Sequence, residues 1–195
     1  MCVMALILRY ELISLRNYSR KGYLMKFYTI KKTVAVCALF FLLGLWGCSN
    51  DGDADQRAPN FTLTGLSGKE STLQEHRGSV VILDFWATWC PPCRMAIPEL
   101  IKMQEQYRGK GLVIIGISLD DPKYASDSFL MAFKEKFGIN YKILRYDENI
   151  MRDYFGTQRP AIPTAFVIDR EGKIRTKVVG FRPVALETAV KETLS

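Results

Sequence analysis

The chain has 195 residues, of which 48% are hydrophobic and 24% are charged, and its formal net charge is +7. This composition is ordinary for a folded globular protein, and it argues against an intrinsically disordered chain, a collagen and a multi-span membrane protein. The excess positive charge lies in residues 1–47, which hold seven basic residues and one acidic residue. Residues 48–195 hold 20 basic and 19 acidic residues, so we expect no basic surface for binding nucleic acid.

Residues 1–47 are predicted to be a leader rather than part of the folded domain. Every residue from 34 to 47 is apolar or glycine, and Lys31 and Lys32 precede this run. As a helix the run spans about 21 Å, which is short of a hydrocarbon core of about 30 Å, so it is typical of a secretory signal. A compact basic segment begins at Met25, from which we hypothesise that translation starts there and that residues 1–24 are not translated.

The apolar run ends at Leu45-Trp46-Gly47-Cys48, which resembles a bacterial lipobox. The resemblance implies that Cys48 carries a lipid, that the protein is exported, and that its domain faces the periplasm or the cell exterior. Trp46 departs from the pattern, which prefers a smaller residue there, so an uncleaved N-terminal anchor and an ordinary signal stay open as alternatives. Residues 48–57 contain no large apolar side chain and are expected to form a flexible tether.

The cysteine count points to redox chemistry. Of five cysteines, two lie in the leader and Cys48 is the candidate lipid site, so the domain keeps only Cys90 and Cys93. These two and the single His76 cannot complete a four-ligand structural zinc site. Arg94 stands where a C-x-x-C-H haem attachment site requires histidine. We therefore predict no metal site and no bound cofactor, only a redox-active disulfide between Cys90 and Cys93.

Apolar runs and turn signals predict strands alternating with helices over residues 58–195. A continuous apolar run such as residues 80–86 is typical of a strand buried on both faces of a sheet, and periodic apolar positions indicate helices. The sequence Asp169 to Gly172 favours a hairpin near the C-terminus. Together these signals predict a three-layer α/β domain with a mixed sheet. The expected order is strand 80–86, helix 93–107, strand 112–118, helix 126–137, strand 143–144, helix 148–155, strand 165–168, strand 173–179 and helix 183–194.

The chemistry is predicted to lie where the first buried strand meets the first helix, at Trp89-Cys90-Pro91-Pro92-Cys93. A helix N-terminus offers unpaired N–H groups and the positive end of a dipole, and both favour a thiolate at Cys90. Cys93 lies one turn into the helix, where we expect it to be shielded and ready to attack a mixed disulfide.

With these motifs in place, residues 58–195 resemble the exported TlpA/ResA-like thiol–disulfide oxidoreductases of the thioredoxin superfamily. The resemblance includes an N-terminal hairpin at 65–72, a central insert near 120–145, and Ile162-Pro163, which is similar to the family's cis-proline segment. It implies a thioredoxin-like fold with helices on both faces of the sheet. It also implies that an extended backbone at Ile162 and Pro163 faces the dithiol.

The resemblance further implies a substrate-binding rim. Its members would be the two residues of the cis-proline segment and the residues flanking the reactive sulfur, which are Trp89, Pro91 and Pro92.

Two residues depart from the TlpA/ResA pattern. Many of these proteins carry a glutamate three residues after the second cysteine, where this chain has Ala96, so that pattern supplies no such carboxylate here. Asp84, six residues before Cys90, matches the buried aspartate of thioredoxins instead. A carboxyl in an apolar strand is desolvated, so we expect a raised pKa at Asp84 and proton exchange with Cys93.

The predicted function is a monomeric thiol–disulfide oxidoreductase of the cell envelope that reduces disulfides in protein substrates. By resemblance, apocytochrome c is a candidate substrate during cytochrome c maturation, and a membrane protein of the DsbD/CcdA type is a candidate electron donor. The alternative is a thiol peroxidase of the peroxiredoxin group. Its motif would need proline at position 83 and threonine or serine at 87, where this chain has Leu83 and Ala87. A metal-delivery module is a third class, for which no neighbouring ligand set is present.

Overall fold

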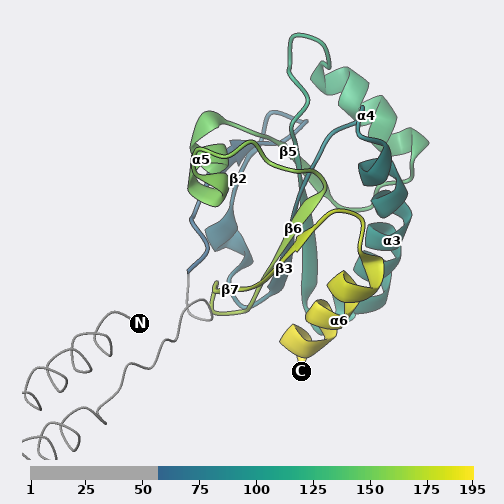
Figure 1. Ribbon diagram of the computed structural model, residues 1–195. Helices are drawn as coiled ribbons and strands as arrows, with labels where there is room; N and C mark the ends of the chain where they lie inside the picture. The colour runs from purple at the N-terminus through teal and green to yellow at the C-terminus, as the bar shows by residue number, and fades with distance from the viewer. Residues whose placement is uncertain (1–56) are drawn as a thin grey trace, which may run out of the picture. The chain divides into compact units, whose positions relative to one another are not determined.

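The computed structural model describes residues 57–195, which form the domain in Figure 1. The predicted leader, the start at Met25, the lipid site at Cys48 and the tether up to residue 56 lie outside the described residues. These expectations therefore stay predictions. Among residues 57–195, no helix has both the length and the apolar character that crossing a bilayer requires.

A five-stranded mixed sheet lies at the centre of the domain, as predicted. The strand order is β5-β4-β3-β6-β7, with β3, β4 and β5 parallel, and with β6 antiparallel to both of its neighbours. All seven residues of β3 are buried, which is what its continuous apolar run indicated. The strands are β3 (Val80–Trp86), β4 (Leu112–Ser118), β5 (Lys142–Arg145), β6 (Thr164–Ile168) and β7 (Ile174–Val179).

Four α-helices cover the two faces of this sheet (Figure 1). One face packs against α3, α4 and α6, and the opposite face packs against α5 and the N-terminal hairpin. The helices are α3 (Pro91–Tyr107), α4 (Asp127–Lys136), α5 (Glu148–Phe155) and α6 (Pro183–Leu194). The expected start of α3 at residue 93 was two residues late. Prolines suit a first helical turn because the N–H groups they lack would have no partner there, so Pro91 and Pro92 belong to the helix.

The N-terminal hairpin and the central insert meet at one edge of the sheet. The hairpin consists of β1 (Thr62–Thr64) and β2 (Glu70–Thr72), so it begins three residues before the predicted range. The insert contributes α4 and the edge strand β5, and a bridge between Gly65 and Leu144 joins the hairpin to that strand. Two short 3₁₀ helices, η1 (Leu73–His76) and η2 (Arg108–Lys110), complete the described elements.

Side chains of β3 alternate between the two cores. Val81, Leu83 and Phe85 point toward α5 and the hairpin, whereas Val80, Ile82 and Trp86 belong to the core beneath α3 and α6. Asp84 falls in the second set, so the strand's one carboxyl group lies on the face that α3 covers.

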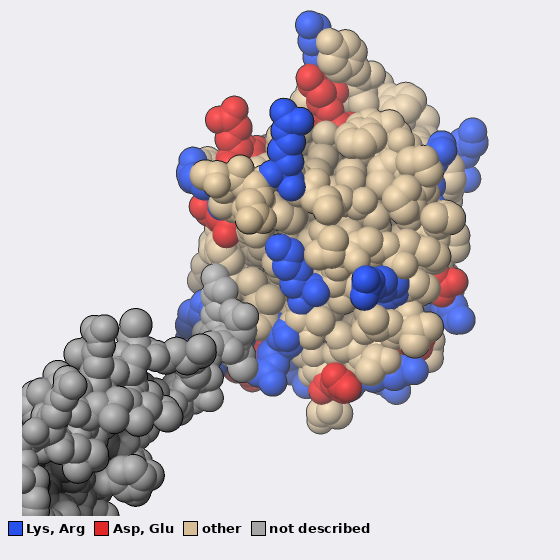
Figure 2. Space-filling model, viewed as in Figure 1, with Lys and Arg blue, Asp and Glu red and all other residues tan. Residues whose placement is uncertain are grey.

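On the face seen in Figure 2, lysine and arginine side chains are scattered among uncharged residues, with acidic side chains between some of them. This face therefore presents single positive charges rather than a continuous basic stripe.

Candidate redox active site

Cys90 and Cys93 form a disulfide at the N-terminus of α3, with their Cα atoms 5.3 Å apart. Cys90 is the N-cap residue of the helix, and its Sγ accepts a hydrogen bond from the backbone N–H of Cys93 at 3.2 Å. This N–H is one of the donors that a helix start leaves without an intrahelical partner. When the disulfide is reduced, the same donor and the helix dipole favour negative charge on Cys90 over Cys93.

The Ile162–Pro163 peptide bond is cis, and this segment faces the dithiol as expected. The carbonyl oxygen of Ile162 lies 3.8 Å from the Sγ of Cys90. Pro163 is buried, and its carbonyl accepts a hydrogen bond of 2.7 Å from the N–H of Gly180. The backbone beside the sulfur is therefore held in place from both β6 and the end of β7.

The predicted rim residues differ in exposure. Trp89 is 66% exposed, Pro91 is exposed and Pro92 is half-buried, whereas Cys90 and Cys93 are 4% and 1% exposed. Phe181 directly follows Gly180 and presents a second large apolar side chain that is partly open to solvent. A nearly buried disulfide with exposed aromatic side chains in its flanking segments suits recognition of a polypeptide, since aromatic surface supplies much of the binding energy in such contacts.

The turn before Cys90 is held by Asp120, a residue that the sequence analysis missed. Asp120 is buried, and its carboxylate accepts hydrogen bonds from the backbone N–H of Thr88 at 3.0 Å and from the Thr88 hydroxyl at 2.6 Å. The hydroxyl of Ser118 donates a third hydrogen bond to it at 2.8 Å. This network joins the end of β4 to the loop that carries Cys90, and it fixes where the first sulfur lies.

Asp84 is 4% exposed, and among residues 57–195 no hydrogen bond to its carboxyl group contributes to its pKa. Its direct neighbours across the sheet are Gly116 on β4, which has no side chain, and Ala165 on β6. Burial raises the pKa of Asp84 from its ordinary value of 3.8 to about 7. The predicted burial of Asp84 is confirmed, while its proton exchange with Cys93 stays a prediction.

Two aromatic residues close the β4 side of Asp84. A Cβ atom on Gly116 would lie 2.8 Å from the indole Nε1 of Trp86 and 3.3 Å from a ring carbon of Tyr141. Both the Trp86 Nε1 and the Tyr141 hydroxyl are buried without a hydrogen-bond partner among the described residues. Burial, and secondarily the charge of Asp84, raises the pKa of Tyr141 well above 10. The glycine inside an apolar strand was the one signal of this close approach.

On its β6 side, Asp84 lines a cavity of about 20 Å³ beneath the cis-proline segment. Apolar side chains from α3, the sheet and α6 make up most of the wall. The polar side chains that line it besides Asp84 are Glu99 and Arg182. The sequence analysis had noted only that position 96 lacks a glutamate. Glu99 lies almost one turn farther along α3 and brings a second carboxyl group to this cavity.

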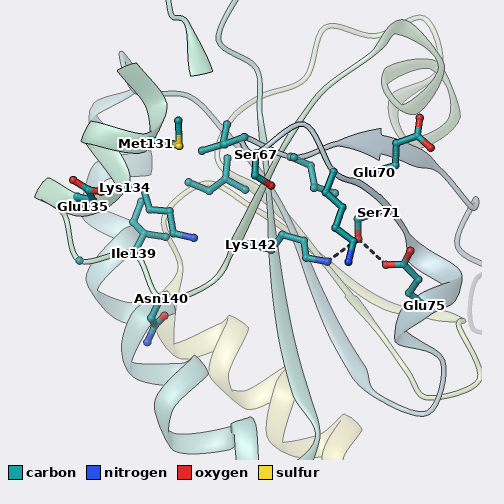
Figure 3. A pocket seen from close by; sticks show the side chains of 16 residues that line it. Ser67, Glu70, Ser71, Glu75, Met131, Lys134, Glu135, Ile139, Asn140 and Lys142 are labelled. Carbon is teal, nitrogen blue, oxygen red and sulfur yellow. Dashed lines mark hydrogen bonds between the residues drawn. The ribbon is translucent and has the colours of Figure 1, made fainter. Parts of the chain in front are cut away.

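A much larger cavity, of about 710 Å³, lies between the hairpin and the insert and contains neither cysteine (Figure 3). Several of its polar side chains are paired with one another or with the backbone. Lys142 donates a hydrogen bond of 2.8 Å to the hydroxyl of Ser71, which donates one of 3.0 Å to Glu75. The ammonium group of Lys134 donates to the backbone carbonyl of Tyr141 at 2.8 Å. These contacts tie β5 and α4 to neighbouring segments, and they give Lys142, Glu75 and Lys134 partners within the protein.

Residues 54–177 match the model of the AhpC/TSA family, which covers well over half of the chain. The chain belongs to the AhpC/TSA family. The match extends from the hairpin through the dithiol and the cis-proline segment into β7, so the AhpC/TSA region contains every predicted site residue of the domain.

Curated relatives of this AhpC/TSA chain carry redox names. The thioredoxin-like protein YneN of Bacillus subtilis is 35% identical over 125 residues, which is 64% of this chain and 71% of YneN. The thiol-disulfide oxidoreductase ResA of Geobacillus thermodenitrificans is 32% identical over 123 residues, covering 63% of this chain and 67% of ResA. Both relatives support the resemblance that the motifs predicted.

A solved structure shows the same fold. The crystal structure of a proposed thiol:disulfide interchange protein DsbE from Chlorobium tepidum has a TM-score of 0.64 and is 34% identical. The similarity covers 73% of this chain and 99% of the DsbE chain. The thioredoxin-like α/β fold that was predicted for residues 58–195 is therefore confirmed.

Proposed function

We propose that the protein is a thiol–disulfide oxidoreductase that reduces disulfides in protein substrates through Cys90 and Cys93. The observation that carries this proposal is the position of Cys90. Its sulfur caps α3, accepts the Cys93 N–H, and lies 3.8 Å from the cis-proline backbone. The relatives named as thiol–disulfide oxidoreductases support the same activity.

In the first step, the Cys90 thiolate attacks one sulfur of a substrate disulfide. A bond forms between Cys90 and that sulfur, and the other substrate sulfur leaves as a thiolate, which takes up a proton. The backbone at Ile162 lies beside the reacting sulfur, where it can pair with an extended substrate segment. The exposed indole of Trp89, next in the chain to Cys90, supplies apolar contact surface.

In the second step, Cys93 resolves the mixed disulfide. Its thiol loses a proton, its sulfur attacks the Sγ of Cys90, and the second substrate sulfur leaves as a thiolate. The substrate disulfide has then gained two electrons and become two thiols, and the Cys90–Cys93 dithiol has lost two electrons and become a disulfide. We assign Asp84 as the proton acceptor of this step, because a buried carboxyl with a pKa near 7 both takes up and releases protons at neutral pH.

We further propose that the domain is held at a membrane of the cell envelope. The support is the sequence alone, in which a basic flank and an apolar run lead to a lipobox-like Cys48. A membrane thiol donor of the DsbD/CcdA type would then return electrons to the Cys90–Cys93 disulfide, and apocytochrome c is a candidate substrate. Labelling cells with a palmitate analogue tests the anchor, since Cys48→Ser should abolish the label. An unlabelled wild-type protein would contradict lipidation.

The activity itself is tested by following insulin reduction with the purified protein, dithiothreitol and a Cys90→Ser control. Catalysed precipitation of insulin chains by the wild-type protein, and none above background by the variant, is the expected result. A parallel peroxide-consumption assay examines the peroxidase alternative. Peroxide turnover without insulin reduction would contradict the proposed function.

A further inference from the structure

We infer that Glu99 is a positioning residue that exchanges the proton of Asp84 with solvent through the cavity beneath the cis-proline segment. The inference rests on the proposed role of Asp84 in the resolving step. It adds the residue through which that buried carboxyl group loses a proton to solvent and becomes ionised before the mixed disulfide is resolved.

Asp84 needs a proton route because it is almost fully enclosed. It is 4% exposed, and among residues 57–195 no hydrogen bond to its carboxyl group offsets the effect of burial on its pKa. Asp84 accepts a proton from Cys93 only when its carboxyl group is ionised, so any proton that it already carries must first reach solvent for the mixed disulfide to decay. A buried polar group without a protein partner is ordinarily served by a water molecule.

The β4 side of Asp84 offers no proton acceptor. Trp86 presents an N–H group there, which can only donate. Tyr141 keeps its proton at neutral pH, because burial raises the pKa of its phenol well above 10. On this side the two rings also fill the space over Gly116.

The β6 side of Asp84 offers a proton acceptor. The cavity of about 20 Å³ has room for about one water molecule, and Asp84 forms part of its wall. Arg182 also lines it, but a guanidinium stays protonated and cannot accept a proton. The remaining lining side chains, apart from Asp84, are apolar except for Glu99. Glu99 is therefore the one other side chain of this cavity that can take up a proton from Asp84.

The position of Glu99 on α3 suits a route to solvent. Glu99 is half-buried, so its side chain reaches both the cavity and the surface. Ala96 lies nearly one turn before it and also lines the cavity, and its small side chain leaves the space open. The proton balance is simple. Cys93 gives its proton to the Asp84 carboxylate, Asp84 passes one through the cavity water to the Glu99 carboxylate, and Glu99 releases it to bulk water.

The test is stopped-flow measurement of the decay of a mixed disulfide in wild-type, Glu99→Gln and Glu99→Ala proteins. Glu105→Gln is the matched control, because Glu105 lies on the same helix, is exposed, and does not line the cavity. We expect Glu99→Gln to slow the decay by about tenfold, less than a primary proton acceptor contributes, and Glu105→Gln to leave it unchanged. Formate should restore the decay rate of Glu99→Ala, because a small carboxylate can enter the space that the side chain leaves.

Rescue by formate separates proton exchange from a structural role, since a misplaced helix would not respond to a buffer anion. Asp84→Asn is measured in parallel. If Asp84→Asn decays as fast as wild type, the proposed role of Asp84 fails and this inference fails with it. If Asp84→Asn is slow but Glu99→Gln matches Glu105→Gln, or if formate rescues nothing, only the role of Glu99 is overturned.

Discussion

The larger of the two cavities in this domain has the more ordinary chemistry, and the smaller one has the more unusual chemistry. The large one, between the hairpin and the insert, is lined by lysine, serine and glutamate side chains, several of which are paired with one another or with the backbone. The small one, beneath the cis-proline segment, contains a carboxyl group whose pKa is raised by burial alone. Perturbed and unpaired titratable groups mark working sites more often than volume does. We therefore assign a structural role to the large cavity and a role in the reaction to the small one.

The largest effect is expected at the dithiol itself. Cys93→Ser removes the resolving sulfur and leaves Cys90 able to attack, so turnover should stop while mixed disulfides accumulate. Non-reducing electrophoresis after incubation with a disulfide substrate checks this, and dithiothreitol should release the adducts. Adducts that form with Cys90→Ser but not with Cys93→Ser would show that the two roles are reversed.

The next largest effect is expected at Asp84, which forms part of the wall of the small cavity. Asp84→Asn keeps the size of the side chain but cannot accept a proton, so resolution of the mixed disulfide should slow by about 10²-fold. Formation of the mixed disulfide should change little, because the helix terminus assists Cys90. Stopped-flow kinetics separates the two steps, and an unchanged decay would return Asp84 to a purely structural role.

The Asp84→Asn protein should become more stable relative to wild type as the pH rises from 4 to 8. The carboxyl of an unfolded chain ionises above pH 3.8, whereas folded Asp84 keeps its proton up to about pH 7, so wild-type stability falls as pH rises between these values. The accumulated cost is about 4 kcal/mol above pH 7. Denaturant unfolding of the oxidised proteins should show Asp84→Asn gaining on wild type from pH 4 to pH 8. A constant difference across this range would mean that Asp84 is not desolvated.

A third effect concerns the packing on the β4 side of Asp84. Gly116→Ala places a methyl group 2.8 Å from the Trp86 indole nitrogen, within a core that has no spare space there. We expect a loss of about 1–3 kcal/mol in unfolding free energy. Gly109→Ala is the control for adding a methyl group, because Gly109 has open space around its Cα and no positive φ.

The smallest effect is expected in the large cavity. Ser71→Ala breaks the contacts with Lys142 and Glu75, and hydrogen bonds of this kind contribute modestly, so Tm should fall by about 5 °C or less. Insulin reduction should be unchanged. A Ser71→Ala protein that is equally stable but inactive would break the comparison, since the large cavity would then take part in the chemistry.

Local sequence patterns determined much of this domain. Continuous apolar runs predicted the buried strands, and periodic apolar residues with polar caps placed the helices to within about two residues, because these signals act over a few positions. The dithiol and the burial of Asp84 followed from the same strand-to-helix segment, in which every relevant neighbour is close in the chain. The cis bond before Pro163 came from family resemblance, since a proline alone does not specify its isomer.

The surroundings of Asp84 were decided by tertiary structure. Tyr141 reaches it from the insert, Gly116 from β4, and Glu99 and Arg182 from the helices that cover the sheet. Each of these residues has an ordinary local environment in the sequence, and only the strand register and the docking of α3 and α6 bring them to one carboxyl group. Packing between elements far apart in the chain depends on the whole core rather than on a local pattern. For this reason the sequence alone identified the sulfur chemistry. Only the fold placed Glu99 beside the cavity of Asp84, where we propose that it carries protons between Asp84 and solvent.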